Sequence, residues 1–277
     1  MHYYHVDVFT EVPLSGNSLT VFFPEATLSY DRMLRLTQEM RHFESIFLRQ
    51  YEGHTFDARV FTVEEELTFA GHPSLGAAAQ LHELYEAGDE AQWTLRFPQK
   101  TMPVVTRRTA FGFMAEMNQG APFFGEPLDE ATVKPILEAL GIDDVDDRYP
   151  IQVVSTGLRY LLVPVRRGFT DVPFGAPGLS DLLEAAGAKF IGLVDVDGHS
   201  IRTGDNDGRV EDIATGSLAG PAAAYFVRHG AAAAGTEIDI IQGVHLGRES
   251  HLYVTVRDEG VFVRGGIVLL AEGRMRG

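Results

Sequence analysis

The sequence contains no cysteine. This absence excludes disulfides, thiolate metal sites, iron–sulfur clusters and cysteine nucleophiles. Lysine is scarce as well: the only three, Lys100, Lys134 and Lys189, lie in polar or turn-like segments rather than in apolar ones that would lower their pKa. A Schiff-base enzyme, including one that uses pyridoxal phosphate, is therefore not expected.

Positive charge and long apolar runs are also lacking. Lys and Arg number 23 against 39 Asp and Glu, which gives a formal net charge of −16 spread along the chain. Such a surface does not neutralise phosphates and is repelled by anionic lipid, so neither nucleic acid nor a membrane is an expected partner. The sequence has no signal-like leader and no run of ~18 apolar residues. These features predict a soluble, cytoplasmic protein.

Motifs for nucleotides and metals are missing too. The sequence has no Gly-Lys-Ser/Thr loop, no Gly-x-Gly-x-x-Gly after a strand, and no second histidine four residues after His82. We therefore expect no metal and no cofactor.

The length of 277 residues suits about two domains. Short apolar runs bounded by turn residues predict strands, with two similar helices at Pro73–Tyr85 and Ser217–His229. Gly71 and Gly216 precede alanine triplets at the same spacing in these helices, which indicates an internal duplication. Both helices are rich in Gly and Ala, and small residues suit a helix that is enclosed by a curled sheet.

These patterns predict an α+β fold of two strand-rich, barrel-like units, each around a central helix. Pro122–Pro127 is the predicted crossover, because two prolines and a glycine interrupt helical and sheet pairing. The expected units are residues 1–125 and 126–277, and the last strand may return to the first unit. A helix at Leu128–Leu140 would open the second unit.

His72 precedes Pro73, which suits the first helical position, so His72 is the predicted N-cap of the first small-residue helix. Its imidazole would then stand beside free backbone N–H groups and the positive end of the helix dipole, where an anion binds well. A histidine that only caps and packs is the alternative.

The second small-residue helix has a matching start. Thr215 and Ser217 can cap it, Gly216 lets a ligand approach the backbone, and the acids Glu211 and Asp212 lie just upstream. Two helix starts that face one cleft would together hold a small carboxylate. The alternative is that the two acids are solvated capping residues.

Glu44 lies where a helix gives way to an apolar strand. A carboxyl group that enters a buried strand finds a partner or becomes protonated, and desolvation raises its pKa towards the range useful for proton transfer. Glu44 is therefore the candidate acid/base, with a half-exposed helix-end glutamate as the alternative.

Several motifs, in order along nearly the whole chain, resemble the PhzF-like family of phenazine-biosynthesis isomerases. They are Asp7-Val8-Phe9-Thr10, Pro13-Leu14-Ser15-Gly16-Asn17, Glu44-Ser45, Phe69-Ala70-Gly71-His72-Pro73 with Gly76, and Glu211-Asp212-Ile213-Ala214-Thr215-Gly216-Ser217.

The resemblance implies a diaminopimelate-epimerase-like fold of two pseudo-symmetric halves, with the site in the cleft between them. The best-known member of the family isomerises trans-2,3-dihydro-3-hydroxyanthranilate without a cofactor, as a homodimer. The resemblance also implies that Glu44, His72 and Asp212 are catalytic residues. It further implies that Gly71, Gly216 and Ser217 bind the substrate.

One departure concerns the triplet before the glutamate. Family members commonly have Asn-Leu-Ser or a similar triplet there, whereas this chain has Arg41-His42-Phe43, so the substrate is open. The sequence thus predicts a cofactor-independent isomerase that relocates a proton in a small unsaturated carboxylate, in secondary metabolism. An amino-acid epimerase or racemase, and a non-catalytic small-carboxylate-binding protein, are the alternatives.

Overall fold

The computed structural model describes residues 1–68, 70–166, 169–206, 208 and 210–276, so that Phe69 of the predicted motif lies outside the described residues. The chain forms two compact units. The first consists of Met1–Asn118, Gly247–His251 and Arg264–Gly277, and the second of Gln119–Leu246 and Leu252–Val263. Among the described helices, none has the length and apolar character that a membrane crossing requires.

The first unit is a closed barrel. Its sheet follows the order β1-β2-β3-β4-β6-β7-β8-β16, and β1 also pairs with β16, which joins the two ends of the sheet. Its strands are β1 (His2–Val8), β2 (Asn17–Phe23), β3 (Glu44–Glu52), β4 (Thr55–Thr62), β5 (Glu66–Leu67), β6 (Glu90–Arg96), β7 (Thr101–Thr109), β8 (Gly112–Asn118) and β16 (Gly260–Arg274), which starts in the second unit.

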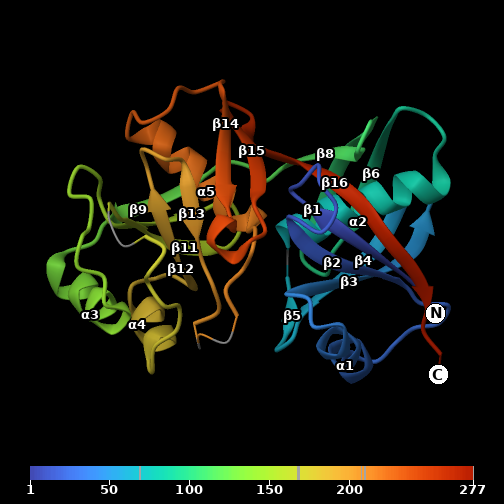
Figure 1. The fold of residues 1–277 in the computed structure, drawn as a ribbon, viewed down its shortest axis with the longest axis horizontal. Coiled ribbons are helices and arrows are strands. Elements are labelled where there is room, and N and C mark those ends of the chain that lie inside the picture. Colours follow the sequence, from blue (N-terminus) through green and yellow to red (C-terminus); the bar gives the residue numbers. More distant parts are fainter. Residues whose placement is uncertain (69, 167–168, 207, 209, 277) are drawn as a thin grey trace. The chain divides into compact units, whose positions relative to one another are not determined.

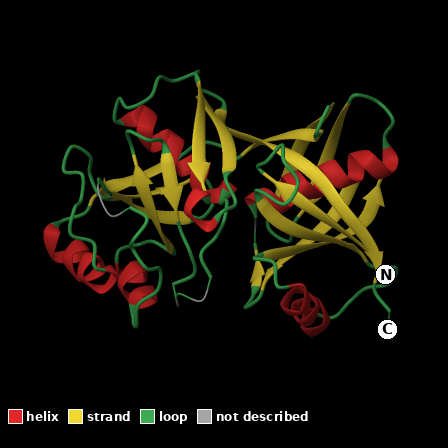
Figure 2. Cartoon of the chain, in the orientation of Figure 1, coloured by secondary structure: helices red, strands yellow, loops and turns green. Residues whose placement is uncertain are grey.

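Helix α2 (Gly71–Tyr85) runs through this barrel and contacts strands all around it (Figures 1 and 2). Gly76 shows why the helix needs small residues: a Cβ atom there would lie 2.7 Å from a Leu19 methyl and 2.9 Å from a Val8 methyl. Helix α1 (Tyr30–Met40) lies on the outside of the barrel, and the Ser29 hydroxyl caps it by accepting the backbone N–H of Arg32.

The second unit curls a sheet of the order β15-β14-β13-β12-β11-β10-β9 around helix α5 (Gly216–Arg228). Its strands are β9 (Phe123–Pro127), β10 (Gln152–Ser155), β11 (Arg159–Pro164), β12 (Phe190–Asp195), β13 (Ser200–Arg202), β14 (Glu237–Gln242) and β15 (Ser250–Arg257), the first residues of which lie in the first unit. Helices α3 (Glu130–Leu140) and α4 (Leu179–Ala185) pack against each other, and a short 3-10 helix, η1, spans Val244–Leu246.

Both units repeat one connection. An antiparallel hairpin, β1–β2 or β10–β11, leads into a helix, α1 or α4, and then into a strand that lies parallel to the second hairpin strand. The predicted α+β fold with two pseudo-symmetric units around central helices is confirmed.

The expected break in sheet pairing at Pro122–Pro127 is wrong. Residues Phe123–Pro127 form β9, which pairs antiparallel with β10 and ends the order of the sheet. Proline is tolerated there because an edge strand leaves one row of backbone groups unpaired, and a register shift between Gln152 and Val154 accommodates the irregular strand.

Candidate active site

The start of α2 places His72 inside the barrel. The helix begins at Gly71 with Ala70 as its N-cap residue and has no side-chain cap, so the prediction that His72 caps the helix is wrong. The N–H groups of a first helical turn have no partner within the helix, so Pro73 is tolerated in this turn. The helix therefore starts before Pro73, and His72 is already helical. His72 is therefore a first-turn residue, and its side chain is buried.

Glu44 and His72 are brought together. Glu44 is the first residue of β3 and lies opposite Leu19 of the parallel strand β2, whose side chain faces α2. The Oε2 atom of Glu44 lies 3.2 Å from Nδ1 of His72, and both side chains are more than nine-tenths buried. The side-chain nitrogen Nδ2 of Asn17, the first residue of β2, lies 3.5 Å from the same imidazole nitrogen.

Burial keeps this imidazole neutral. It lowers the pKa of His72 to about 3, because the imidazolium would lose its hydration, and a charge on His42 would lower it further. The contact of Glu44 with His72 is therefore made to a neutral imidazole at neutral pH and is not an ion pair. The other ring nitrogen, Nε2, is buried and has no hydrogen-bond partner among the described residues.

A second cluster surrounds Asp212, just before α5. The Thr215 hydroxyl donates to Oδ2 of Asp212 over 2.5 Å, and the amide nitrogen of Gln242 donates to the backbone oxygen of Asp212 over 2.8 Å. Gln242 also accepts the backbone N–H of Thr215. All three side chains are buried, so the loop before α5 and the aspartate are fixed by β14.

The first turn of α5 carries the predicted binding residues. The Ser217 hydroxyl lies 2.8 Å from the hydroxyl of Tyr160 on β11, and the carbonyl of Gly216 accepts the side chain of Gln119 over 2.8 Å. Thr215 is the N-cap residue, but neither it nor Ser217 caps the helix through its side chain. The capping role expected for these two hydroxyls is therefore wrong: one bonds Asp212 and the other bonds Tyr160.

Glu211 is not a solvated capping acid. Its carboxylate accepts two hydrogen bonds from the buried guanidinium of Arg202, of 2.7 and 2.9 Å, and lies 2.9 Å from Nε2 of His245. This salt bridge holds the segment that leads into Asp212, whose backbone N–H donates to Thr203 of the same unit. The role of Glu211 is thus to position the loop.

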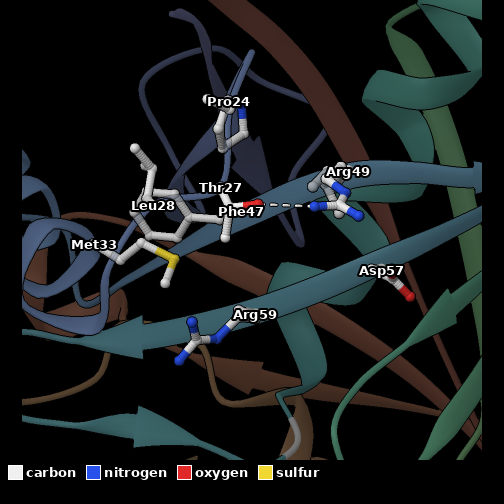
Figure 3. Close-up of a pocket in the computed structure, with 10 residues that line it drawn as sticks. Pro24, Thr27, Leu28, Met33, Phe47, Arg49, Asp57 and Arg59 are labelled. Atoms are coloured by element: carbon white, nitrogen blue, oxygen red, sulfur yellow. Dashed lines mark hydrogen bonds between the residues drawn. The ribbon is translucent and has the colours of Figure 1, made fainter.

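A pocket of about 240 Å³ lies outside the barrel, between α1 with the segment 24–28 before it and strands β3 and β4 (Figure 3). Its wall is mostly apolar, and both of its arginines have partners: Arg49 donates to Thr27, and Arg59 binds Glu66. Phe47 lines this pocket, and strand alternation puts it on the face of β3 opposite to Glu44. The pocket is therefore separate from the Glu44 cluster.

The structure thus gathers the predicted residues in two clusters, with Glu44, Gly71 and His72 in the first unit, and Asp212, Gly216 and Ser217 in the second. That the two clusters share one cleft stays a prediction. Sequence reasoning did not assign a site role to the following contacts of these residues: Asn17, Gln119, Tyr160 and Gln242. Among the described residues, no group of three or more His, Asp or Glu side chains is arranged to hold a metal ion.

Comparison with known proteins shows the family of this chain. The family model described as phenazine biosynthesis-like protein matches residues 6–171 and 206–273. Trans-2,3-dihydro-3-hydroxyanthranilate isomerase of Pseudomonas aeruginosa is 34% identical, over 99% of both chains. The uncharacterized isomerase YddE of Escherichia coli O157:H7 is 32% identical, over 96% of this chain and 95% of the relative.

Solved structures extend the likeness. The structure of a predicted epimerase from Pseudomonas aeruginosa is 45% identical, with a TM-score of 0.95 over 99% of this chain and 98% of the other. A probable proline racemase from Agrobacterium radiobacter is 12% identical, with a TM-score of 0.63 over 99% of this chain and 92% of the other, and therefore shares the fold alone.

The fold and the relatives define the class: an isomerase with a fold similar to that of diaminopimelate epimerase. Within this class, the chain belongs to the PhzF family.

Proposed function

We propose that this protein is a cofactor-independent isomerase that moves a proton within a small unsaturated carboxylate. The observation that carries the proposal is the buried contact of 3.2 Å between Glu44 and the neutral imidazole of His72. A buried carboxyl group beside a neutral partner is placed to act as a general acid and base on a bound substrate.

In the proposed reaction Glu44 removes a proton from a carbon that the conjugated system acidifies. The electron pair of the broken C–H bond moves into that system, and Glu44 returns the proton to a carbon further along it. The double bond moves and no atom is gained or lost. His72 and Asp212 orient the amino or hydroxyl groups of the substrate and assist the transfer.

The substrate carboxylate is held by the helix starts in this proposal. The Ser217 hydroxyl and the N–H groups near Gly71 and Gly216 donate to it, because the first N–H groups of a helix lack intrahelical acceptors. The same donors stabilise the negative charge that builds up when the proton leaves.

The first substrate to test is trans-2,3-dihydro-3-hydroxyanthranilate. Two relatives that are 34% identical to this chain are named as isomerases of this compound. A role in secondary metabolism is part of this proposal. A different small conjugated carboxylate is the next choice, because the triplet Arg41-His42-Phe43 departs from the family pattern.

The Glu44→Gln variant tests the proposal. It keeps the size of the side chain but cannot act as an acid or base, so turnover should fall roughly 10²- to 10⁴-fold. Glu64→Gln, the same change at an exposed position, should leave turnover unchanged. Turnover of Glu44→Gln within a few-fold of the wild type would refute the assignment of Glu44.

Epimerisation is the second candidate, because the 45% identical structure is described as a predicted epimerase. An epimerase exchanges the hydrogen of one stereogenic carbon and inverts that carbon. Proton NMR in deuterated water together with polarimetry separates the two reactions. Exchange at an α-carbon with loss of optical rotation indicates an epimerase, whereas a shifted double bond indicates an isomerase.

The proposal includes a cytoplasmic homodimer that acts on a small molecule, as the family resemblance implies. Light scattering of the purified protein tests the dimer, because a monomer has a mass of 30.5 kDa. A measured mass near the monomer value at micromolar concentration would contradict it.

A further inference from the structure

The bend between α1 and β3 places Glu44. Helix α1 ends at Met40, and its C-cap residue Arg41 is a non-glycine residue with a φ of 57°, in the left-handed region; Glu44 begins β3 three residues after Arg41. Few non-glycine residues adopt this conformation, so the surrounding structure must hold it. Only Arg41, His42 and Phe43 separate the helix from the candidate acid/base.

His42 joins this bend to the barrel. Its Nδ1 atom lies 2.8 Å from the hydroxyl of Thr20, a fully buried residue of β2. Its ring packs on the ring of His5, with 4.4 Å between the ring centroids. Thr20 lies opposite His5 in β1 and opposite Ser45 in β3, so these three residues form a row across the three strands. His42 contacts the first two of them, on β1 and β2.

The two faces of these strands carry different groups. Leu19 faces α2 inside the barrel, and the neighbouring Thr20 therefore faces outward. Glu44 lies opposite Leu19, and Ser45 lies opposite Thr20. His42 thus binds Thr20 on the outer face of β2, while the neighbouring Leu19, on the inner face, lies opposite Glu44.

The surroundings keep His42 uncharged. Burial lowers the pKa of His42 to about 4, and positive charges on His5 and Arg248 act in the same direction. Asp7, whose charge acts on the neighbouring His5, binds Arg248 at 2.9 Å and accepts from Ser18. A neutral imidazole is therefore the hydrogen-bond partner of Thr20 at neutral pH.

We propose that His42 is a positioning residue for Glu44: its hydrogen bond to Thr20 and its packing on His5 fix the bend that sets the distance between the Glu44 carboxyl group and His72. This inference rests on the proposed function of Glu44. It gives a role to the middle residue of the triplet that departs from the family pattern.

The test compares two histidine–threonine hydrogen bonds of the same barrel. Thr20→Val removes the bond to His42, whereas Thr106→Val removes the bond of 2.7 Å between the Thr106 hydroxyl and Nδ1 of His82, elsewhere in the unit. Thr20→Ser keeps the hydroxyl and should rescue the first variant. Each variant is assayed with trans-2,3-dihydro-3-hydroxyanthranilate, or with the substrate found for the wild type.

We expect Thr20→Val to lower kcat about tenfold or more, since small displacements of a catalytic group are costly, while KM changes less than twofold. The midpoint of the pH profile of kcat should also shift, because the contact between the Glu44 carboxyl group and His72 changes. Thr20→Ser and Thr106→Val should keep the wild-type kcat and pH midpoint. A Thr20→Val variant with wild-type kcat and midpoint would overturn the inference.

A measurement without substrate separates this inference from the proposed function. The ¹⁵N NMR signals of the His72 ring should move in Thr20→Val and stay in place in Thr106→Val. If Glu44→Gln is fully active, the proposed function fails, and the His72 signals alone decide whether His42 positions Glu44. Unchanged His72 signals in Thr20→Val would overturn the positioning role.

Discussion

Burial of His72 makes the fold sensitive to acid. An unperturbed histidine has a pKa of 6.5, whereas burial lowers the pKa of His72 to about 3. Between these values the unfolded chain binds a proton at this position and the folded chain does not. The free energy of unfolding is therefore retained above pH 6.5 and falls as the pH decreases from 6.5 towards 3.

The size of the loss follows from the pH interval. Each pH unit within the window costs about 1.4 kcal/mol per group, so moving from pH 6.5 to 4.5 removes on the order of 2–3 kcal/mol through His72. The titratable group in contact with this imidazole is Glu44, at 3.2 Å, and a charge on His42 would lower the pKa of His72 further. His42 itself, with a pKa lowered to about 4, adds a loss of the same sign.

Urea denaturation at pH 7.5 and pH 4.5 measures this effect. The wild type and His72→Asn are compared, because titrating groups that do not interact with His72 contribute equally to both proteins. The variant should lose about 2 kcal/mol less than the wild type between the two pH values. His2→Asn, at an exposed position, should behave like the wild type. An equal loss in His72→Asn and in the wild type would refute the burial of a neutral imidazole at this position.

Three further variants test the packing and the polar contacts around the two helices. Arg202→Leu leaves the carboxylate of Glu211 without its guanidinium partner, and urea denaturation should show a loss of about 3 kcal/mol; a loss under ~1 kcal/mol would contradict the role of this salt bridge. Gly76→Val forces a side chain against β1 and β2 and should cost about 1–3 kcal/mol in the same assay, whereas unchanged stability would show that α2 can shift. Tyr160→Phe removes the hydroxyl that contacts Ser217, so KM for the carboxylate substrate should rise several-fold in steady-state kinetics; an unchanged KM would argue against substrate binding by this serine.

Composition and short motifs were sufficient to predict the central helices and the candidate acid/base. Both helices are so rich in Gly and Ala that they lack an ordinary apolar stripe, and this property alone indicates enclosure on several sides. Glu44 could be selected because a carboxyl group at the start of an apolar strand must be partnered or protonated. Its contact with His72 depends on the parallel pairing of β2 with β3, which local sequence does not reveal.

The partners of the site residues could not be predicted for a related reason. Tyr160 and Gln242 lie on strands far in sequence from Ser217 and Asp212, and a shift of one residue in strand register would turn either side chain to the opposite face. One sequence does not fix that register. The early start of α2 was missed because proline at the third helical position is as acceptable as proline at the first.

The repeated connection in the two units carries different chemical groups, which supports an acid/base role for the first unit and a binding role for the second. In the first unit, the parallel pair β2–β3 sets Leu19 opposite Glu44, and in the second unit the pair β11–β12 sets Tyr160 opposite Phe190. The first residue of the strand after the connecting helix is therefore a carboxylic acid in one unit and a phenyl ring, which cannot carry a proton, in the other. Under the proposed function, one side chain must both remove and return the proton, and the hydroxyl of Tyr160 serves binding through its contact with Ser217.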